Sequence, residues 1–297
     1  MNSPIVIENL TKRFGNQPAL QSINLRVPAG RVIGLLGRNG AGKTTLLNIA
    51  CGLVLPTEGS CETLGRQSRL LESSHLIRLG LVPQESRLLE WMKVQQHLAF
   101  TASFYRNWDS AREKRLLAEL ELDEARKIGQ LSSGDQQKLS IILAVCHHPS
   151  LILLDEPISA LDPIVRIRLL NQLLAIVRED ECTVVISSHI LADLEKIIDW
   201  VVCLDHGEVA VHAALDEIQE SYAEWTVTAP DGGLPDKFPE PFVLSQEGNS
   251  RQVRLCVRCG SEGKTALAAK YRAEIASRPL TLEQLFPLLL RERILRS

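Results

Sequence analysis

One segment constrains this sequence more than any other: Gly37-Arg-Asn-Gly-Ala-Gly-Lys43-Thr44 fits the pattern GxxxxGK[ST]. An apolar stretch that ends at Leu36 precedes it, and a segment of helical periodicity, Thr44 to Ala50, follows it. A glycine loop between a strand and a helix N-terminus binds phosphate with backbone N–H groups, a lysine and a Mg²⁺-binding hydroxyl. The predicted phosphate-binding residues are Gly37, Arg38, Asn39, Gly40, Ala41, Gly42, Lys43, Thr44 and Thr45.

A second segment supplies two adjacent carboxylates. Asp155 and Glu156 follow Leu151-Ile-Leu-Leu154, an apolar run with the length and composition of a buried strand. Ligands of open α/β sheets bind beside the C-terminal ends of such strands. We therefore expect Asp155 to hold Mg²⁺ through water and Glu156 to orient and deprotonate an attacking water.

The order of the elements favours an α/β fold. Strands are predicted at 5–10, 23–27, 31–36, 151–154 and 183–187, and helices at 44–50, 136–146 and 163–178. Residues 86–127 are mostly helical in pattern, most clearly at 111–127, and indicate an inserted helical subdomain. Strands that alternate with helices predict a largely parallel sheet covered on both faces.

The character of the sequence changes near residue 215. Prolines and glycines cluster at 230–241, and helical patterns return at 264–276 and 282–293. Thr281 and Gln284 form a capping-box pattern, and Pro287 is expected to kink or end the last helix. We predict one domain at 1–215, with the helical subdomain at about 86–135, and a small α/β accessory domain at 216–297.

Composition and charge argue against several classes. The chain has 33 Lys and Arg against 36 Asp and Glu, so no basic excess indicates a nucleic-acid partner. No apolar run approaches the roughly 20 residues that cross a bilayer, and the N-terminus lacks a secretory pattern, so a cytoplasmic protein is expected. The 7 cysteines are an odd number, which favours reduced thiols. Cys256 and Cys259 lie in an alternating segment and are interpreted as part of a strand.

The segment Leu131-Ser132-Ser133-Gly134-Asp135 stands between the helical insertion and the strand that ends in two carboxylates. In this order of motifs, about residues 4 to 212 of the chain resemble the nucleotide-binding domain of ABC transporters, whose signature motif reads LSGGQ. Ser133 replaces the first glycine and Asp135 the glutamine, while Ser132 and Gly134 are retained. The resemblance implies that this loop, Ser133 included, contacts ATP, with the Ser132 hydroxyl and the Gly134 backbone at the γ-phosphate.

Four further residues match motifs of the same family. Gln84 stands where the family has its glutamine loop, which senses Mg²⁺ or the attacking water and relays that state to the membrane subunit. Asp162 matches the D-loop, and His189 matches the histidine that contacts the γ-phosphate. Phe14 stands in the place of the ring that stacks on adenine, usually a tyrosine; the alternative is an ordinary core phenylalanine.

The resemblance implies an α/β P-loop NTPase fold of the ABC type, with a mixed, largely parallel sheet, an N-terminal antiparallel β part, an inserted helical subdomain and a small C-terminal α/β appendage. It also implies hydrolysis of ATP with Mg²⁺. The catalytic residues would be Glu156, His189, Lys43 and Gln84, and the metal would be bound by Thr44, Gln84 and Asp155.

The expected partners are separate transmembrane permease subunits and a second ATPase copy, identical or related, that closes around ATP and supplies Ser132 and Gly134 to the site. The protein would then lie peripherally on the inner face of the cell membrane. A single ATPase module with a short appendage is closest in architecture to bacterial drug and antibiotic exporters. One alternative is a soluble ABC-type ATPase that acts on nucleic acid or ribosomes. Another is a nucleotide-gated scaffold, which would lack a catalytic group such as Glu156.

Overall fold

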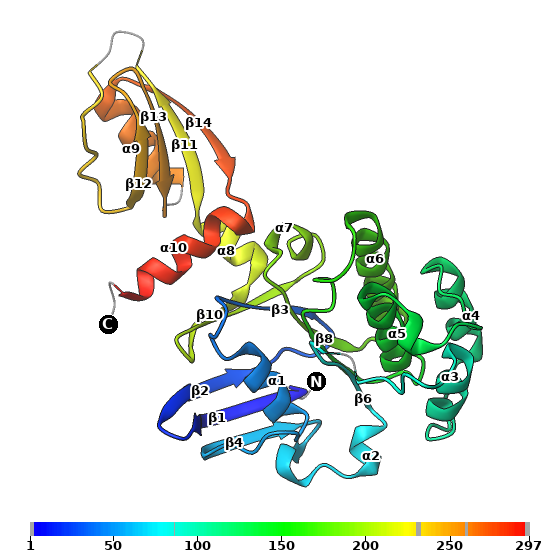
Figure 1. Cartoon of the computed structure of the whole chain (residues 1–297). Helices are drawn as coiled ribbons and strands as arrows, with labels where there is room; N and C mark the ends of the chain where they lie inside the picture. Colours follow the sequence, from blue (N-terminus) through cyan, green and yellow to red (C-terminus); the bar gives the residue numbers. More distant parts are fainter. Residues whose placement is uncertain (1–2, 86, 230–232, 259–260, 295–297) are drawn as a thin grey trace. The chain divides into compact units, whose positions relative to one another are not determined.

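A six-stranded sheet organises the N-terminal part of the chain in the computed structural model, which describes residues 3–85, 87–229, 233–258 and 261–294 (Figure 1). The strand order is β10 (Glu208–Ala214), β9 (Trp200–Asp205), β3 (Val32–Gly37), β8 (Thr183–Ser187), β7 (Leu151–Asp155) and β6 (Leu79–Val82). From β9 to β6 all neighbours pair in parallel. Every residue of β3, β7 and β8 is buried, which confirms the parallel sheet covered on both faces.

A second sheet is antiparallel and confirms the predicted N-terminal β part. Its order is β2 (Gln17–Arg26), β1 (Ile5–Phe14), β4 (Glu58–Thr63) and β5 (Arg66–Gln67). Helix α1 (Lys43–Ala50) lies between the two sheets (Figure 1). One cluster of buried side chains joins all three layers, with members such as Leu10, Leu35, Ile49 and Leu153. The glycine loop is therefore anchored by a strand on one side and a core helix on the other.

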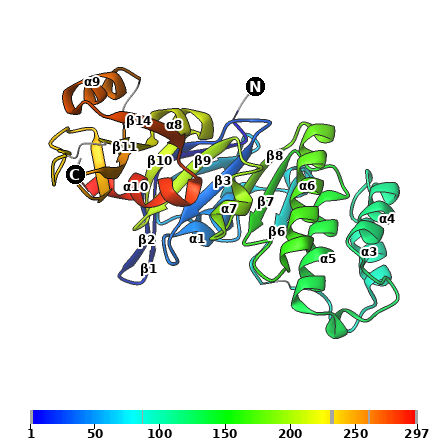
Figure 2. The ribbon, with the colours of Figure 1, turned by 90° about the horizontal axis from the view of Figure 1, so that it is seen from above.

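The helical insertion lies on the outer side of two long helices, α5 (Ser133–Val145) and α6 (Pro163–Asp180), as Figure 2 shows. It contains α3 (Val94–Ala102) and α4 (Ser110–Glu119); residue 86, where the predicted subdomain begins, is outside the described residues. The helix predicted at 111–127 was too long, because Glu121 adopts φ 54° and the chain turns away. Shorter helical segments are η1 (Ser68–Leu70), α2 (Ser73–Leu76), η2 (Ile128–Gln130) and α7 (Leu191–Leu194).

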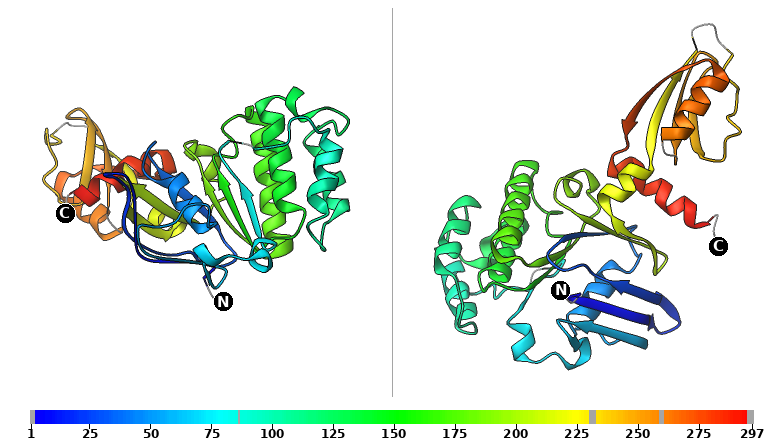
Figure 3. Two further views of the ribbon diagram at one scale, coloured as in Figure 1. Left: turned by 60° about the horizontal axis from the view of Figure 1, so that its bottom comes forward. Right: turned by 180° about the vertical axis from the view of Figure 1, so that it is seen from behind.

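The chain divides into two compact units, Met1–His212 and Ala213–Ser297. The second unit has an antiparallel sheet of β12 (Val243–Gly248), β13 (Gln252–Val257), β11 (Ala223–Thr228) and β14 (Glu274–Pro279), in that order. Its helices are α8 (Leu215–Ser221), α9 (Ser261–Tyr271) and α10 (Leu282–Ile294), and α9 covers one sheet face with Leu267 in the core (Figure 3).

One expectation for the second unit was wrong in detail. The helix predicted at 264–276 ends at Tyr271, since Arg272 adopts φ 48° and the next residues pair with β11 as a strand. Helix α10 continues through Pro287, so of the two predicted effects of this proline, a kink or an end, the helix does not end there. The capping box is confirmed, because the Thr281 N–H donates to Gln284 Oε1 at 3.1 Å and the Gln284 N–H donates to Thr281 Oγ1 at 3.4 Å.

Cys256 lies on β13, as predicted, while its CxxC partner Cys259 is outside the described residues. Within the described parts of the chain, no helix combines the length and the apolar character needed to cross a membrane.

Candidate active site

The loop between β3 and α1 has glycine at the positions where the backbone adopts a conformation that strains other residues. Gly40 and Gly42 have φ of 80° and 102°, and Gly42 is the N-cap of α1. A Cβ on Gly37 would lie 2.6 Å from the carbonyl oxygen of Leu204, and a Cβ on Gly42 would lie 2.7 Å from that of Ala19. The glycine spacing is thus required by both conformation and space, and it leaves a loop that can approach a ligand with its backbone.

Lys43, the first residue of α1, is buried, with 8% of its surface exposed. Its ammonium group donates to the carbonyl oxygens of Gly37 at 2.8 Å and Arg38 at 3.3 Å. No ion pair involves Lys43 among the residues that the structure describes. The loop therefore holds a buried positive charge that has neutral partners only, and an anion can replace these partners.

The two carboxylates lie at the C-terminal end of β7, as predicted, and one hydroxyl bridges them. Asp155 pairs in register with Ser187 of the neighbouring strand β8. Ser187 Oγ donates to Asp155 Oδ1 at 2.6 Å and accepts from the Glu156 N–H at 2.9 Å. Ser187 is fully buried and was given no role from the sequence. The available signal was its place at the end of the strand after β7.

Glu156 has a buried carboxylate that is held by His189. The ring Nδ1 of His189 lies 2.8 Å from Glu156 Oε2, and the backbone N–H of His189 donates to the same oxygen at 3.3 Å. Both contacts come from one residue, so a single carboxylate oxygen of Glu156 is held at two points. The side chain of His189 is 58% exposed. Glu156 itself has φ 50°, so the backbone turns sharply where the carboxylate leaves the strand.

A pocket of about 250 Å³ brings the loop and the carboxylates together. Gln84, which is exposed, lies in its wall two residues beyond the end of β6. Ala19 of β2 is a further lining residue that the sequence did not indicate. The pocket is lined by Ala19, Asn39, Gly40, Ala41, Gly42, Lys43, Thr44, Thr45, Gln84, Asp155 and Glu156. Gly37 and Arg38 contribute through their carbonyl groups, which hold Lys43.

Phe14 ends β1 in the hairpin that also contains Ala19. Its ring is 54% exposed, and the Lys12 ammonium lies 4.8 Å from the ring centroid. The alternative of an ordinary core phenylalanine is therefore wrong. An exposed ring offers a face on which a planar base can stack.

Ser132 is the N-cap of α5, and its Oγ accepts from the Asp135 N–H at 3.1 Å. Burial opposes ionisation of Asp135, but hydrogen bonds from Lys138 and Ser132 outweigh it and lower the pKa of this carboxyl below its usual value. A Cβ on Gly134 would lie 3.1 Å from the carbonyl oxygen of Ala160. Ser132 and Ser133 are exposed, and neither they nor Gly134 line the described pocket.

Asp162 is the N-cap of α6 and is exposed. Its Oδ1 accepts from the N–H groups of Ile164 and Val165, each at 3.1 Å. Pro163 occupies the first helical position, where its missing N–H has no cost. Within one chain Asp162 thus has a local capping contact, and it is not among the pocket-lining residues of the described chain.

Comparison with protein families matches residues 20–159 to the ABC transporter family model. The uncharacterized ABC transporter ATP-binding protein MJ1023 of Methanocaldococcus jannaschii is 34% identical, over 88% of this chain and 98% of that protein. This match is longer than the first unit and extends into the second.

Several relatives have names that state a cargo, of two kinds. The bacitracin transport ATP-binding protein BcrA of Enterococcus faecalis is 32% identical, over 81% of this chain and 79% of its own length. The aliphatic sulfonates import ATP-binding protein SsuB of Pseudomonas fluorescens is 33% identical, over 70% of this chain and 76% of its own.

A solved structure shares the fold. It is the dimeric, post-hydrolysis state of the ATP-binding cassette MJ0796 bound to ADP and Pi, with a TM-score of 0.64 and 28% identity. The match covers 71% of this chain and 98% of that chain.

Proposed function

The chain belongs to the ABC transporter ATP-binding proteins, and from this premise we propose that it hydrolyses ATP to drive a separate transmembrane partner. One observation carries the proposal: the buried ammonium group of Lys43, which has no ion pair within the described residues, lines the same pocket as two carboxylates. The phosphates of a nucleoside triphosphate supply negative charge for the ammonium group. Its metal ion supplies positive charge for the carboxylates. ATP hydrolysis is the activity of the family.

In the proposed complex Lys43 exchanges its two carbonyl partners for phosphate oxygens, and the N–H groups of the glycine loop surround the phosphates. Phe14 offers its exposed face to adenine. Thr44, Gln84 and Asp155 would hold Mg²⁺; a single carboxylate beside substrate oxygens and water is the ligand set this ion prefers. The ion supplies charge neutralisation to the phosphates when it is bound.

Glu156 is the proposed general base. Both contacts from His189 go to Oε2, so Oε1 is the oxygen that receives the proton of the attacking water. Ser187 fixes the backbone of Glu156 and the carboxylate of Asp155 at once. More than half of the His189 side chain is exposed, and its ring is proposed to contact the γ-phosphate as well.

A second copy is proposed to complete the site with Ser132, Ser133, Gly134 and Asp162. The support is that Ser132 and Asp162 each cap a helix at an exposed N-terminus, while the pocket of the same chain is lined without them. Helix N-termini favour anions. The solved dimer of a related cassette provides a precedent for two copies.

The test of catalysis is Glu156→Gln, which keeps the shape of the side chain and removes the base. ATP turnover should fall by about 10² to 10⁴, and an ATP-bound dimer should accumulate. A phosphate-release assay and light scattering with ATP measure both results. Turnover near that of the unchanged protein would exclude Glu156 as the base.

The composite site is tested by mixing two defective chains. Lys43→Ala cannot bind the phosphates, and Ser132→Arg cannot present its loop, so each homodimer has two defective sites. In the heterodimer the intact loop of one chain meets the intact Ser132 of the other, and ATP-dependent heterodimers with partial activity should form. If neither activity nor heterodimer appears at any mixing ratio, the proposed arrangement is wrong.

The transmembrane partner is proposed to dock on the helical insertion. Trp91, Phe100 and Phe104 are exposed there by 70%, 45% and 64%. Exposed aromatic residues of this size mark protein contacts, and Gln84 leads directly into this segment. Gln84→Ala should therefore impair transport more than ATP binding. Recovery of the native protein without any hydrophobic partner after crosslinking would reject this part and favour a soluble ATPase.

For the direction of transport we propose export. The single ATPase module with a short second unit has the architecture of drug exporters, and BcrA is among the relatives. A relative named for sulfonate import has similar identity, so the decisive measurement is the direction of ATP-dependent substrate movement in vesicles. We propose a peripheral location on the cytoplasmic membrane face, held by that partner.

A further inference from the structure

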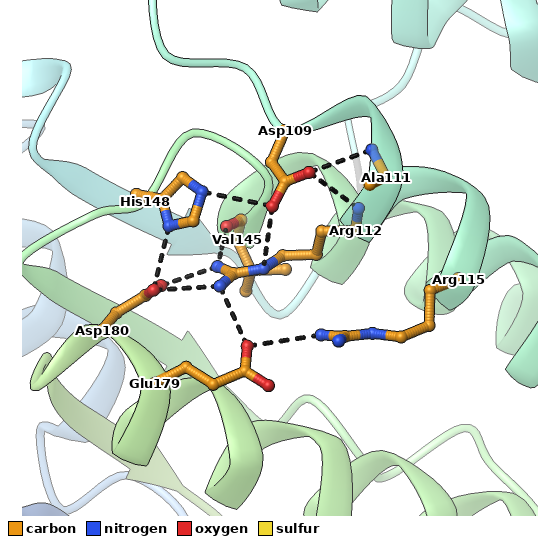
Figure 4. Close-up of polar contacts among 8 residues, drawn as sticks. All are labelled: Asp109, Ala111, Arg112, Arg115, Val145, His148, Glu179 and Asp180. Carbon is orange, nitrogen blue, oxygen red and sulfur yellow. Dashed lines mark hydrogen bonds and ion pairs between the residues drawn. The ribbon is translucent and has the colours of Figure 1, made fainter.

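Arg112 of α4 is buried outside the pocket, with only 3% of its surface exposed (Figure 4). Its two terminal nitrogens donate to both carboxylate oxygens of Asp180, at 2.6 and 2.9 Å, in a bidentate pair. Nη1 also donates to the carbonyl oxygen of Val145 at 3.1 Å, and Nη2 donates to Glu179 at 3.2 Å. Val145 ends α5 and Asp180 ends α6, so one guanidinium joins the C-terminal ends of both helices.

Asp109 and His148 extend these contacts. Asp109 caps α4 by accepting from the N–H groups of Ala111 and Arg112, each at 2.9 Å. The two ring nitrogens of His148 lie 2.9 Å from Asp180 Oδ1 and 3.3 Å from Asp109 Oδ2. We call the set of Asp109, Arg112, His148, Glu179 and Asp180 the arginine clamp (Figure 4).

Asp180 is the carboxylate at the centre of the clamp, and its contacts favour the ionised form. Burial opposes ionisation of Asp180, but hydrogen bonds from Arg112 and His148 outweigh it and hold the pKa of Asp180 below its usual value. A bidentate pair adds geometric specificity as well as energy. The clamp therefore ties α4 to the C-terminal ends of α5 and α6.

The opposite ends of the same two helices carry the residues proposed to close on a partner's ATP. Ser132 caps α5 and Asp162 caps α6. At this end the loop before α6 lies close to α5, because a Cβ on Gly134 would be only 3.1 Å from the Ala160 carbonyl oxygen. Helix α5 has 13 residues, so its two ends are about 20 Å apart.

We infer that Arg112 is a positioning residue: through α5 and α6 it holds the Ser132 loop and the Asp162 loop as one rigid unit that closes on the ATP of a second copy. The inference rests on the proposed function, because both loops matter only in a composite site. Since α4 belongs to the helical insertion, a partner that moves the insertion moves both loops together.

The experiment compares Arg112→Met with the matched control Arg115→Met, both in the Glu156→Gln background that accumulates the ATP dimer. Arg115 is on the same helix, its side chain is 41% exposed, and it contacts Glu179 at 3.4 Å. The measurements are the ATP-dependent dimer dissociation constant by sedimentation, ADP affinity of the monomer, and hydrogen exchange of the amides at 133–137.

Arg112→Met should weaken dimerisation on the order of tenfold and speed exchange at 133–137, with ADP affinity unchanged. Arg115→Met should leave all three within about twofold of the parent, because surface ion pairs contribute little. Arg112→Lys should be intermediate, because an ammonium group cannot hold both oxygens of Asp180 and the Val145 carbonyl together. If the methionine variant does not fold, the lysine variant decides.

The inference is overturned if a folded Arg112 variant dimerises like the parent, or if exchange rises only around the clamp and not at 133–137. In that case Arg112 has a structural role alone. If the Glu156→Gln parent itself forms no dimer with ATP, the proposed function fails first, and the inference fails with it. The parent measurement therefore separates the two failures.

Discussion

Lys43 and Arg112 are both buried cations, with 8% and 3% of their surfaces exposed, but their surroundings are opposite. The ammonium of Lys43 has two carbonyl oxygens of its own loop as partners. The guanidinium of Arg112 faces three carboxylates, those of Asp109, Glu179 and Asp180. Among the described residues Lys43 has no ion-pair partner, whereas Arg112 is paired.

The difference separates a ligand site from a structural joint. Burial of an unpaired charge costs free energy, and a chain retains such a group where a ligand brings the opposite charge. A paired cluster needs no ligand and instead ties together the elements that carry its members. Lys43 therefore belongs to the chemistry, while Arg112 acts on it through the two helices that it joins.

The first prediction concerns Lys43, the buried cation without an ion pair in the described chain. Lys43→Met should reduce ATP turnover by about 10² to 10³, because the phosphates lose their main cationic partner. The same change should alter unfolding free energy by less than about 1 kcal/mol, since two hydrogen bonds are lost but a buried unpaired charge is also removed. ATPase assays and urea titrations measure the two effects. Turnover equal to that of the parent would contradict the assignment.

The second prediction concerns Arg112, the buried cation that is paired with carboxylates. Arg112→Met should lower the unfolding free energy by about 3 kcal/mol, because Asp180 loses its bidentate partner and the Val145 carbonyl loses its donor. Arg115→Met should cost less than about 0.5 kcal/mol, because its ion pair is exposed. Urea titrations followed by tryptophan fluorescence measure both. Equal losses in the two variants would show that the clamp is no stronger than a surface pair.

A third prediction sharpens the role of the neutral donors around the carboxylates. Ser187→Ala should raise the Mg²⁺ concentration needed for half-maximal turnover by about tenfold, because Asp155 loses the donor that orients it. The control is Ser188→Ala, an equally buried neighbour whose hydroxyl accepts from the Ile190 N–H instead. A Mg²⁺ requirement that is the same in both variants would remove Ser187 from the site.

The smallest expected effect concerns His147, which is buried beside the clamp and stacks on Tyr105 with ring centroids 4.1 Å apart. Burial lowers the pKa of His147 below its usual value, so the folded protein favours the neutral ring. Its contribution to stability is present above pH 6.5, declines as pH falls below that value, and is lost once the folded pKa is passed.

The free energy of unfolding should therefore fall less between pH 7.5 and pH 5.5 in His147→Gln than in the parent, as measured by urea titrations. Asp109 and Asp180 do not interfere in this range. Hydrogen bonds from the α4 backbone lower the pKa of Asp109, and those from Arg112 and His148 lower that of Asp180 against the effect of burial, so both lose their contribution only in stronger acid. An unchanged pH profile in the variant would assign the loss to other groups.

The sequence by itself determined the parts whose contacts lie within a few residues. The glycine loop, the apolar strand before Asp155 and the N-cap pattern at Thr281 depend on local spacing, which can be read directly. Where helical periodicity continued past the real end of a helix, the prediction was wrong. Leu122 lies in the loop after α4, but its side chain is buried. It therefore continues the apolar spacing of the helix although it is not part of the helix.

Only the tertiary structure decided which distant groups meet. Ser187 reaches Asp155 because β7 and β8 pair in one register, and Arg112 reaches Asp180 across 68 positions because α4 packs over the ends of two other helices. Phe14 is exposed, whereas Leu10 and Leu20 of the same hairpin are buried in the core. Strand register and helix packing depend on the whole core at once, so no single segment of the sequence contains the information that sets these contacts.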